Sequence, residues 1–303
     1  MNFLEEGALA QVDSNILILS KEFSAGVTQE RNAINPGAFA RLGQVWSCSS
    51  LSEYLNSGVS TAPKEYEVFF KTLPARNLKV LDIGVASGES SLYLASLGHE
   101  VWAVEPSFNM CRLISRMKDN LDLSVHPICS VGEDIDRLTE RNFDVVAFNA
   151  SLHHCDDPLR ALKNAYKLLK PSGTIFLSAE TQLRFWQSKV KWQRWLEEHP
   201  EQSGHYGGNE HAYYSWEYIN LLHQAGFSCV SQMASGMFRD KAFRVEFDRI
   251  HAVGVHQRAQ PLKYQIRVIY YSLMQALSAV TPLFKILARW SVVPSQYQAK
   301  TRI

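Results

Sequence analysis

Short apolar segments alternate with helical patterns through the middle of the chain. Helical patterns predict helices over Lys64–Leu73, Ser90–Ser96, Asn109–Asp119 and Leu159–Leu169. Short apolar runs bounded by turn residues predict strands over Lys79–Ile83, Glu100–Val104, Leu123–Cys129, Asp144–Phe148 and Gly173–Ser178. This alternation favours βαβ units, and therefore a parallel sheet covered by helices on both faces. The expected fold class is a doubly wound α/β sheet.

A loop rich in small residues follows the first predicted strand. It reads Val80-Leu-Asp-Ile-Gly-Val-Ala-Ser-Gly-Glu89, and the small residues at 84, 86 and 88 let the backbone turn tightly and approach a ligand. In a parallel sheet, ligands bind at the carboxyl ends of the strands, where this loop lies. A dinucleotide-binding G-x-G-x-x-G pattern is excluded because its third glycine falls on Glu89, and the sequence has no phosphate-binding G-x-x-x-x-G-K-[ST] motif.

The loop and later segments resemble class I S-adenosylmethionine-dependent methyltransferases. The loop is similar to motif I of that family, D-x-G-x-G-x-G, and Glu105 closes the second predicted strand 21 residues after Gly84. Phe143–His154 resembles the family's fourth strand with its "LHH" end, and Leu168–Gly173 resembles the turn into the fifth strand. The resemblance covers residues 79–180, a third of the chain. It implies a Rossmann-like methyltransferase fold with a mostly parallel, seven-stranded sheet.

The resemblance also implies S-adenosyl-L-methionine as the cofactor. Asp82 would hold the methionine amino group, through water or directly, and Glu105 would accept hydrogen bonds from the ribose hydroxyls. The loop backbone would pass beneath the methionine and ribose, and Ser130–Glu133 would lie beside adenine. The expected cofactor-binding residues are Asp82, Gly84, Val85, Ala86, Ser87, Gly88, Glu105, Pro106, Gly132, Glu133, Asn149 and Ala150.

Two positions depart from the family pattern. Ala86 replaces the middle glycine of motif I, which is tolerable if φ is negative there. Val131 stands where the family often has Asp, so adenine would be recognised through the backbone. Taken singly, Gly84 and Gly88 could merely end a strand and Glu105 could be an exposed loop acid. Their joint spacing within one β/α series favours the cofactor site.

Two histidine-containing segments are candidates for the methyl acceptor site. A hydroxyl acceptor needs a base that takes its proton, and the pKa of histidine suits that role. The candidate catalytic residues are His153, His154, Glu210 and His211. A hydrogen-bonded structural pair is the alternative for the two adjacent histidines. No metal is expected, because adjacent loop residues, such as those of His153–Asp157, rarely point at one ion.

The carboxyl-terminal part of the chain is basic. The chain has 303 residues, 46% apolar and 20% charged, as in globular proteins, and its net charge is only +1. From Arg249 onward there are eight basic and no acidic residues, which leaves 23 basic against 30 acidic residues before it. If residues 263–290 form one helix that is kinked at Pro282, their basic side chains lie in one sector and their apolar side chains lie on the opposite face. This arrangement is typical of a helix at a membrane interface. Packing on its own domain, or on a second subunit of a homo-oligomer, is the alternative.

The patterns divide the chain into three parts. We expect a helical extension over 1–60, a methyltransferase domain over 61–255 with a cap near 181–215, and a basic amphipathic helical tail over 256–303. The five cysteines form no C-x-x-C pair, and the first residues are acidic where a signal peptide is basic. We therefore expect a cytoplasmic protein, with peripheral contact at the inner face of the membrane through the tail.

The expected reaction is methyl transfer from S-adenosyl-L-methionine to an oxygen or nitrogen of a small-molecule, glycan or lipid-linked acceptor. One alternative is an RNA methyltransferase that uses the basic tail, although nucleic acid is the less favoured partner. A second alternative is a non-catalytic relative that keeps the fold for binding. The sequence leaves open the acceptor, the oligomeric state and the role of the first 60 residues.

Overall fold

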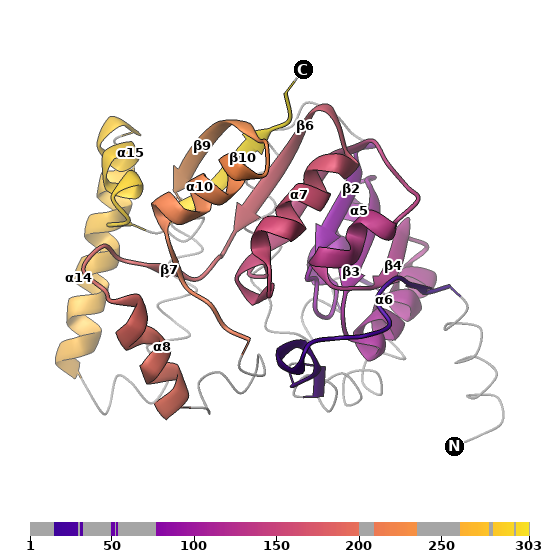
Figure 1. Ribbon diagram of the computed structural model, residues 1–303, viewed down its shortest axis with the longest axis horizontal. Coiled ribbons are helices and arrows are strands. Elements are labelled where there is room, and N and C mark those ends of the chain that lie inside the picture. Colours follow the sequence, from indigo (N-terminus) through magenta and orange to yellow (C-terminus); the bar gives the residue numbers. More distant parts are fainter. Residues whose placement is uncertain are drawn as a thin grey trace.

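A computed structural model describes most of the chain after residue 76. The described residues are 15–29, 31–32, 50–51, 53, 77–199, 209–234, 261–278, 281–293 and 295–302. Figure 1 shows a twisted central sheet with helices packed against it. The predicted helix Lys64–Leu73 lies outside the described residues.

The central sheet contains eight strands in the described part of the chain. They are β1 (Leu17–Ile18), β2 (Lys79–Ile83), β3 (Glu100–Glu105), β4 (Val125–Cys129), β5 (Phe143–Asn149), β6 (Leu169–Ser178), β9 (Ser228–Ala234) and β10 (Ser295–Lys300). Their order across the sheet is β1-β4-β3-β2-β5-β6-β10-β9. The pairs from β1 to β6 are parallel, whereas β10 is antiparallel to both β6 and β9. The chain order reverses at β2, and such a reversal opens a crevice at the carboxyl ends of the neighbouring strands.

Helices cover both faces of the sheet. They are α5 (Glu89–Ser96), α6 (Phe108–Leu121), α7 (Pro158–Leu168), α8 (Lys189–Glu198), α10 (Ser215–Gln224), α14 (Pro261–Ser278) and α15 (Thr281–Arg289), with 3₁₀ turns η1 (Gly132–Arg137) and η2 (Leu152–His154). Polar caps fix where two of them begin: the Ser107 hydroxyl accepts the Met110 N–H before α6, and the Asp157 carboxylate accepts the Arg160 N–H before α7. Two short strands, β7 (Gln182–Leu183) and β8 (Tyr213–Tyr214), pair separately in parallel.

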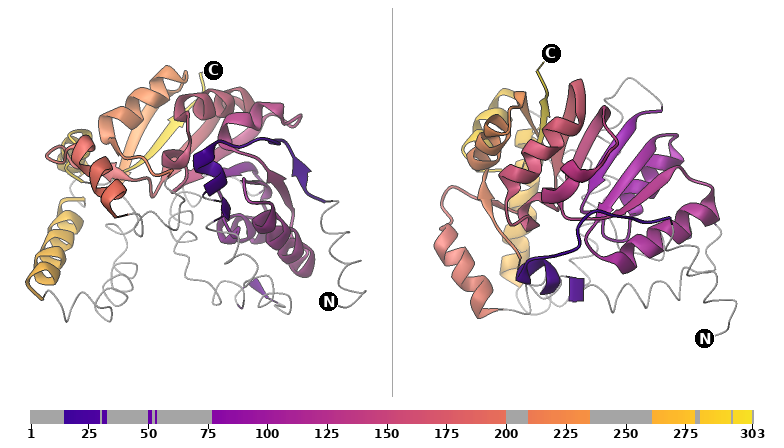
Figure 2. Two further views of the ribbon diagram at one scale, coloured as in Figure 1. Left: turned by 60° about the horizontal axis from the view of Figure 1, so that its bottom comes forward. Right: turned by 45° about the vertical axis from the view of Figure 1, so that its right-hand side comes forward.

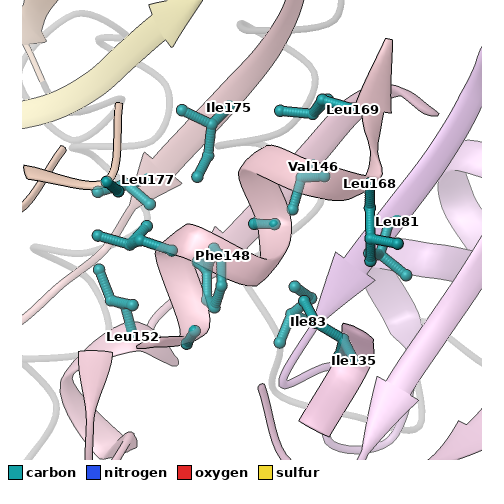
Figure 3. Packing of buried hydrophobic residues seen from close by; sticks show 14 of the residues in the cluster. Leu81, Ile83, Ile135, Val146, Phe148, Leu152, Leu168, Leu169, Ile175 and Leu177 are labelled. Atoms are coloured by element: carbon teal, nitrogen blue, oxygen red, sulfur yellow. The ribbon is translucent and has the colours of Figure 1, made fainter. Parts of the chain in front are cut away.

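Alternate residues of the strands enter two apolar clusters, one on each face. On β2, Leu81 and Ile83 pack in the cluster that contains residues of α7 and α10, and Val80 packs in the cluster that contains residues of α5 and α6. Figure 3 shows side chains of the first cluster meeting between the sheet, α7 and η1. Burying one such side chain contributes about 1.5–3 kcal/mol. Because both faces are buried, these strands have continuous apolar sequences, which explains why the sequence predicts them well.

The doubly wound α/β fold is confirmed, and all five predicted strands form. The three predicted helices that fall in the described residues also form. The largest difference in bounds is at β6, which begins at Leu169 rather than Gly173 because its pairing with β5 shifts register between Phe143 and Val145. The sheet has eight described strands instead of the expected seven.

The tail differs from the expected helical segment at its end. Helix α14 extends to Ser278 and α15 begins at Thr281, with Pro282 at its second position, and the two residues between them lie outside the described part of the chain. Residues Ser295–Lys300 are not helical and form β10, which lies inside the sheet between β6 and β9. Every second residue of this segment is small or aromatic, and Tyr297 and Ala299 are fully buried. Its polar Ser and Gln residues hide that alternation in the sequence.

The amino-terminal extension also differs from the expected helical segment. Leu17 and Ile18 form β1, which pairs in parallel with β4 at the edge of the sheet. Within the described part of this segment, helix is present at residues 25–29, 31–32, 51 and 53. The described residues of the extension therefore add a strand to the sheet, and Val27 reaches the pocket at the carboxyl ends of the strands.

Candidate active site

A pocket lies at the carboxyl ends of β2, β3, β4 and β5, where the sheet topology predicts one. Its empty volume is about 660 Å³, a figure that includes space open to solvent. Its lining residues are Val27, Ile83, Gly84, Ala86, Glu105, Pro106, Ser130, Val131, Gly132, Glu133, Ala150, Ser151, His154 and Cys155. Seven of the twelve expected cofactor-binding residues line this pocket. The other five, Asp82, Val85, Ser87, Gly88 and Asn149, do not.

The two loop glycines have backbone conformations that favour glycine. Gly84 has φ of 75° and Gly88 has φ of 81°, both left-handed. A Cβ on Gly84 would lie 2.3 Å from Cβ of Ser151, and a Cβ on Gly88 would lie 2.5 Å from Cγ1 of Ile114. The glycines therefore let the loop pack closely against η2 and α6, in addition to shaping the pocket.

Ala86 departs from its expected conformation. Its φ is +48°, in the left-handed region, rather than negative. Residues with a Cβ pay about 1–2 kcal/mol for this conformation. In this conformation the Ala86 N–H donates a hydrogen bond to Oε2 of Glu105, at the end of β3, at 2.9 Å. The backbone at this position therefore favours glycine, although the chain has alanine there.

Glu105 is buried at the end of β3 with both carboxylate oxygens occupied. Oε2 accepts the Ala86 N–H and Oε1 accepts the Ser107 N–H, each at 2.9 Å. Burial raises the pKa of Glu105 to about 7, against the opposing effect of the two N–H donors and the Arg31 guanidinium. The side chain lines the pocket, so its charge state affects any ligand bound there.

Asp82 lies beneath the loop rather than in the pocket. Its carboxylate is buried and accepts hydrogen bonds from the Ser90 and Ser91 hydroxyls, at 3.0 and 2.7 Å. It thereby ties the first turn of α5 to β2. Asp82 is not among the residues that line the pocket. Its expected contact with a methionine amino group, through water or directly, stays a prediction.

The remaining expected residues outside the pocket also have structural partners. Val85 belongs to the apolar cluster beneath α5 and α6. The Ser87 hydroxyl donates to Glu89 at 2.5 Å, and Asn149 accepts a hydrogen bond from the Ser178 hydroxyl at 2.6 Å. These contacts hold the loop and the end of β5 in place through residues that do not line the pocket.

The amino-terminal segment contributes residues to the pocket that the sequence did not indicate. Val27 lines the pocket. The Ser20 hydroxyl accepts the Val131 N–H at 3.2 Å and donates to Asp134 at 2.9 Å. These contacts join the segment to the loop after β4, more than 100 residues later in the chain. No local pattern in the sequence could have revealed them.

Glu180 is a second functional candidate that the sequence analysis did not include. It follows β6, and its buried carboxylate accepts the backbone N–H groups of Ser151, Leu152 and His153 at 3.0–3.2 Å. It also bonds Nδ1 of His153 at 2.6 Å. Its position just past a parallel strand, at the ligand end of the sheet, was the signal that could have identified it.

Three of the four candidate catalytic residues come together beside Glu180. Nε2 of His153 lies 3.7 Å from Oε1 of Glu210, and Nδ1 of His154 lies 3.6 Å from Oε2 of the same carboxylate. The fourth, His211, contacts the group through its backbone, because its N–H donates to the His153 carbonyl at 3.1 Å. His153, His154 and Glu210 are called the His–Glu cluster below.

The two adjacent histidines have different electrostatic surroundings. Burial lowers the pKa of His154 to about 4, helped by the neighbouring His153, so its imidazole is neutral at pH 7. Burial also acts to lower the pKa of His153, but the charge and hydrogen bond of Glu180 outweigh it and raise that pKa. His154 is the member of the His–Glu cluster that lines the pocket. It connects the cluster to the space where a ligand binds.

A family model described as a methyltransferase domain matches residues 56–232. This match covers more than half of the chain, so the chain belongs to this methyltransferase domain family. The match confirms the class of enzyme, and with it S-adenosyl-L-methionine as the cofactor.

Solved structures share the fold at low sequence identity. The chain is similar to phosphoethanolamine N-methyltransferase 2 of Haemonchus contortus in complex with S-adenosyl-L-methionine, with a TM-score of 0.52 and 15% identity over 79% of this chain and 52% of that chain. It is similar to the [4+2]-cyclase SpnF with a TM-score of 0.51 and 15% identity over 80% of this chain and 81% of that chain. At these identities the likeness shows the fold alone.

Curated relatives match a smaller part of the chain at higher identity. The ubiquinone biosynthesis O-methyltransferase of Coxiella burnetii (strain Dugway 5J108-111) is 33% identical over 101 residues. The protein of the same name from Xanthomonas campestris pv. campestris (strain B100) is 35% identical over 103 residues. Each match covers 33% of this chain and 42% of the relative. The match therefore spans less than half the length of these relatives.

Proposed function

We propose that the chain transfers a methyl group to a hydroxyl oxygen of a small-molecule acceptor. The observation that carries the proposal is the neutral imidazole of His154, which lines the cofactor pocket and connects it to the His–Glu cluster. The O-methyltransferase names of the relatives that match residues of this chain support an oxygen acceptor. Nitrogen, glycan and lipid-linked acceptors are outcomes of the test below.

The pocket residues fit S-adenosyl-L-methionine in shape and chemistry. We assign the loop residues Gly84 and Ala86 to the space beneath it, Glu105 to the ribose hydroxyls, and Gly132 and Glu133 to the adenine side. Glu105 lines the pocket at the end of β3, and its carboxylate can accept two hydrogen bonds from a diol once it is ionised. The cofactor supplies a methyl group already activated by its sulfonium centre.

The protein's part in the reaction is to orient the acceptor hydroxyl and remove its proton. Nδ1 of His154 lies 3.0 Å from the Asn209 carbonyl, which can only accept, so we assign the ring proton to Nδ1 and the lone pair to Nε2. Nε2 would then take the hydroxyl proton, and the Glu210 carboxylate would stabilise the imidazolium that forms. Val27, above the pocket, would exclude water from it. General base catalysis of this kind contributes about 10²–10⁴-fold to a rate.

Acceptor screening with labelled cofactor tests the proposal. Cell extract divided into small-molecule, lipid, glycan and RNA pools is incubated with the protein. We expect label in the small-molecule or lipid pool, and a loss of at least about 100-fold in kcat for His154→Ala. The matched control is His223→Ala, an exposed histidine on α10 that should keep full activity. Label only in RNA would establish the RNA alternative, and cofactor binding without any labelled product would establish the non-catalytic one.

We also propose that α14 and α15 contact an anionic lipid surface. Four apolar side chains repeat at intervals of three or four residues along α14 and are each 53–69% exposed: Leu262, Ile266, Ile269 and Leu273. On α15 and just after it, Ile286 and Trp290 are exposed beside the exposed Lys285 and Arg289. Figure 2 shows both helices at the end of the molecule away from α6. The absence of any acidic residue after Arg249 matches this surface to anionic lipid.

This contact would be peripheral. Within the described residues, no helix is both long enough and apolar enough to cross a membrane. The side chains of Lys263 and Arg267, which the sequence analysis places in the basic sector, lie outside what the structure describes. A surface of this kind would bring the pocket close to acceptors that are dissolved in or linked to lipid.

A further inference from the structure

We infer that the His–Glu cluster is a binding site for one divalent transition-metal cation. The sequence argued against a metal here because adjacent residues rarely point at one ion. In the structure, the η2 turn packs both rings on the same side, with ring centroids 4.2 Å apart and an angle of 42° between the planes. One ligand atom from each of His153, His154 and Glu210 lies within 4.8 Å of the others.

One printed distance is close to that of a tetrahedral site. Two ligand atoms that each lie about 2.1 Å from a tetrahedral zinc ion are about 3.4 Å apart. Nε2 of His153 lies 3.7 Å from Oε1 of Glu210, so this pair is within a few tenths of an ångström of that spacing. His154 would offer Nε2, because its Nδ1 bonds the Asn209 carbonyl at 3.0 Å, which is a usual second partner of a ligating histidine.

Glu210 carries a buried oxygen that a cation would satisfy. Its Oε1 accepts the Thr181 hydroxyl at 2.8 Å, but its Oε2 is buried without a hydrogen-bond partner. In the described part of the chain, neither Glu210 nor Glu180 forms an ion pair with a lysine or arginine. Two carboxylates are thus grouped around two imidazoles, and buried charges in proteins are normally paired or coordinate metals.

His153 is oriented as a metal-ligating histidine is. Nδ1 bonds the Glu180 carboxylate at 2.6 Å, which places the proton on Nδ1 and leaves the lone pair of Nε2 facing Glu210. Histidine ligands of metals almost always donate their other ring N–H to a carboxylate, carbonyl or water, and such partners are worth about 10–100-fold in metal affinity. Glu180 is therefore a positioning residue for the site.

The donor set indicates the class of cation. Two imidazole nitrogens and one carboxylate oxygen form the three-ligand set of catalytic zinc sites, which keep a fourth position open. Magnesium and calcium prefer oxygen ligands and are disfavoured. Because His154 also lines the pocket, the open position would face the acceptor. This role rests on the proposed function: with a cation bound, Nε2 of His154 would be a ligand instead of the base, and the cation would assist deprotonation by lowering the pKa of a bound acceptor hydroxyl.

Metal binding is measured without any acceptor, which separates this inference from the proposed function. The full chain is stripped with a chelator and titrated with zinc by calorimetry, with cobalt as the spectroscopic probe of geometry. We expect one equivalent per chain, a tetrahedral cobalt spectrum without thiolate bands, and a Tm that rises with zinc. Glu210→Gln should abolish stoichiometric binding and the Tm rise, and Glu180→Gln should weaken binding by about 10–100-fold. Glu217→Gln, which changes a carboxylate of α10 outside the cluster, should bind as the parent does.

Three outcomes would overturn the inference. They are the absence of saturable zinc binding, binding that Glu210→Gln leaves unchanged, and a cobalt spectrum dominated by thiolate ligands, which would move the metal to a cysteine. If Glu210→Gln fails to fold, Glu180→Gln with its intact ligand set provides the same comparison. Methylation without metal binding would leave the proposed function standing, with His154 as the base.

Discussion

Ala86 shows how one side chain can conflict with the geometry that its site requires. The loop after β2 keeps left-handed backbone at residues 84, 86 and 88, but only the first and last are glycine. The strain at Ala86 accompanies an N–H directed at Glu105. Backbone strain of this kind persists where the surrounding structure holds it, which occurs often at ligand sites.

Ala86→Gly should stabilise the protein. Glycine relieves a left-handed cost of about 1–2 kcal/mol, and its greater entropy when unfolded offsets part of that gain. The expected gain is about 1 kcal/mol in the free energy of unfolding, measured by urea denaturation. As a matched control, Ala95→Gly inside α5 should lose about 1 kcal/mol or more, because there the backbone is helical. If both variants lose the same free energy of unfolding, the left-handed backbone at Ala86 does not destabilise the protein and the prediction is wrong.

At the scale of single elements, local patterns and long-range contacts were predictable to very different degrees. β2, its loop and β3 follow from continuous apolar runs and from small residues in the loop. β10 does not, because Ser295–Lys300 is polar in sequence and becomes a strand only when β6 and β9 offer it both edges. Glu180 could have been found from its position just past the end of β6. Val27 could not, because it reaches the pocket only through the assembled sheet, which no local pattern encodes.

The α14–α15 surface is tested by its affinity for vesicles. The parent should co-sediment with vesicles containing anionic lipid and less with neutral ones. Ile266→Asp with Ile269→Asp should reduce partitioning more than tenfold, because an inserted apolar side chain contributes about 1.5–3 kcal/mol. Gln265→Asp with Ser272→Asp adds the same charge at exposed polar positions of the same helix and should reduce it much less.

A different result would refute the lipid surface. Equal loss in both double variants would mean that charge alone governs partitioning. No partitioning of the parent, together with a dimer by light scattering that Ile266→Asp dissociates, would assign the same face to a second copy of the chain.

At the scale of the whole molecule, the parallel order of the strands assembles the pocket. Four strands end at one edge, so residues from 84 to 154 meet there although they are far apart in the chain. The sequence predicted this edge and seven of its lining residues, because their type and spacing follow the strand ends. It did not indicate that the Asp82 carboxylate accepts hydrogen bonds from the Ser90 and Ser91 hydroxyls of α5, because position in a motif does not specify the orientation of a side chain.

The central claim is that this pocket holds S-adenosyl-L-methionine with Glu105 as its charged contact. Because burial raises the pKa of Glu105 to about 7, the free carboxyl is mostly protonated below that pH and ionised above it. A cationic ligand whose hydroxyls donate to Glu105 favours the ionised carboxylate. At pH 6 the protonated Glu105 must lose its proton when the ligand binds, which weakens binding. At pH 8 Glu105 is already ionised, so binding is not weakened.

Calorimetric titration with S-adenosyl-L-methionine at pH 6 and pH 8 tests this claim most directly. The account predicts tighter binding at pH 8 for the parent, and binding at least about tenfold weaker at pH 8, with little remaining pH dependence, for Glu105→Gln. Glu100→Gln, which changes the exposed carboxylate at the other end of β3, should behave as the parent does. Equal affinities of Glu105→Gln and the parent at both pH values would contradict the account.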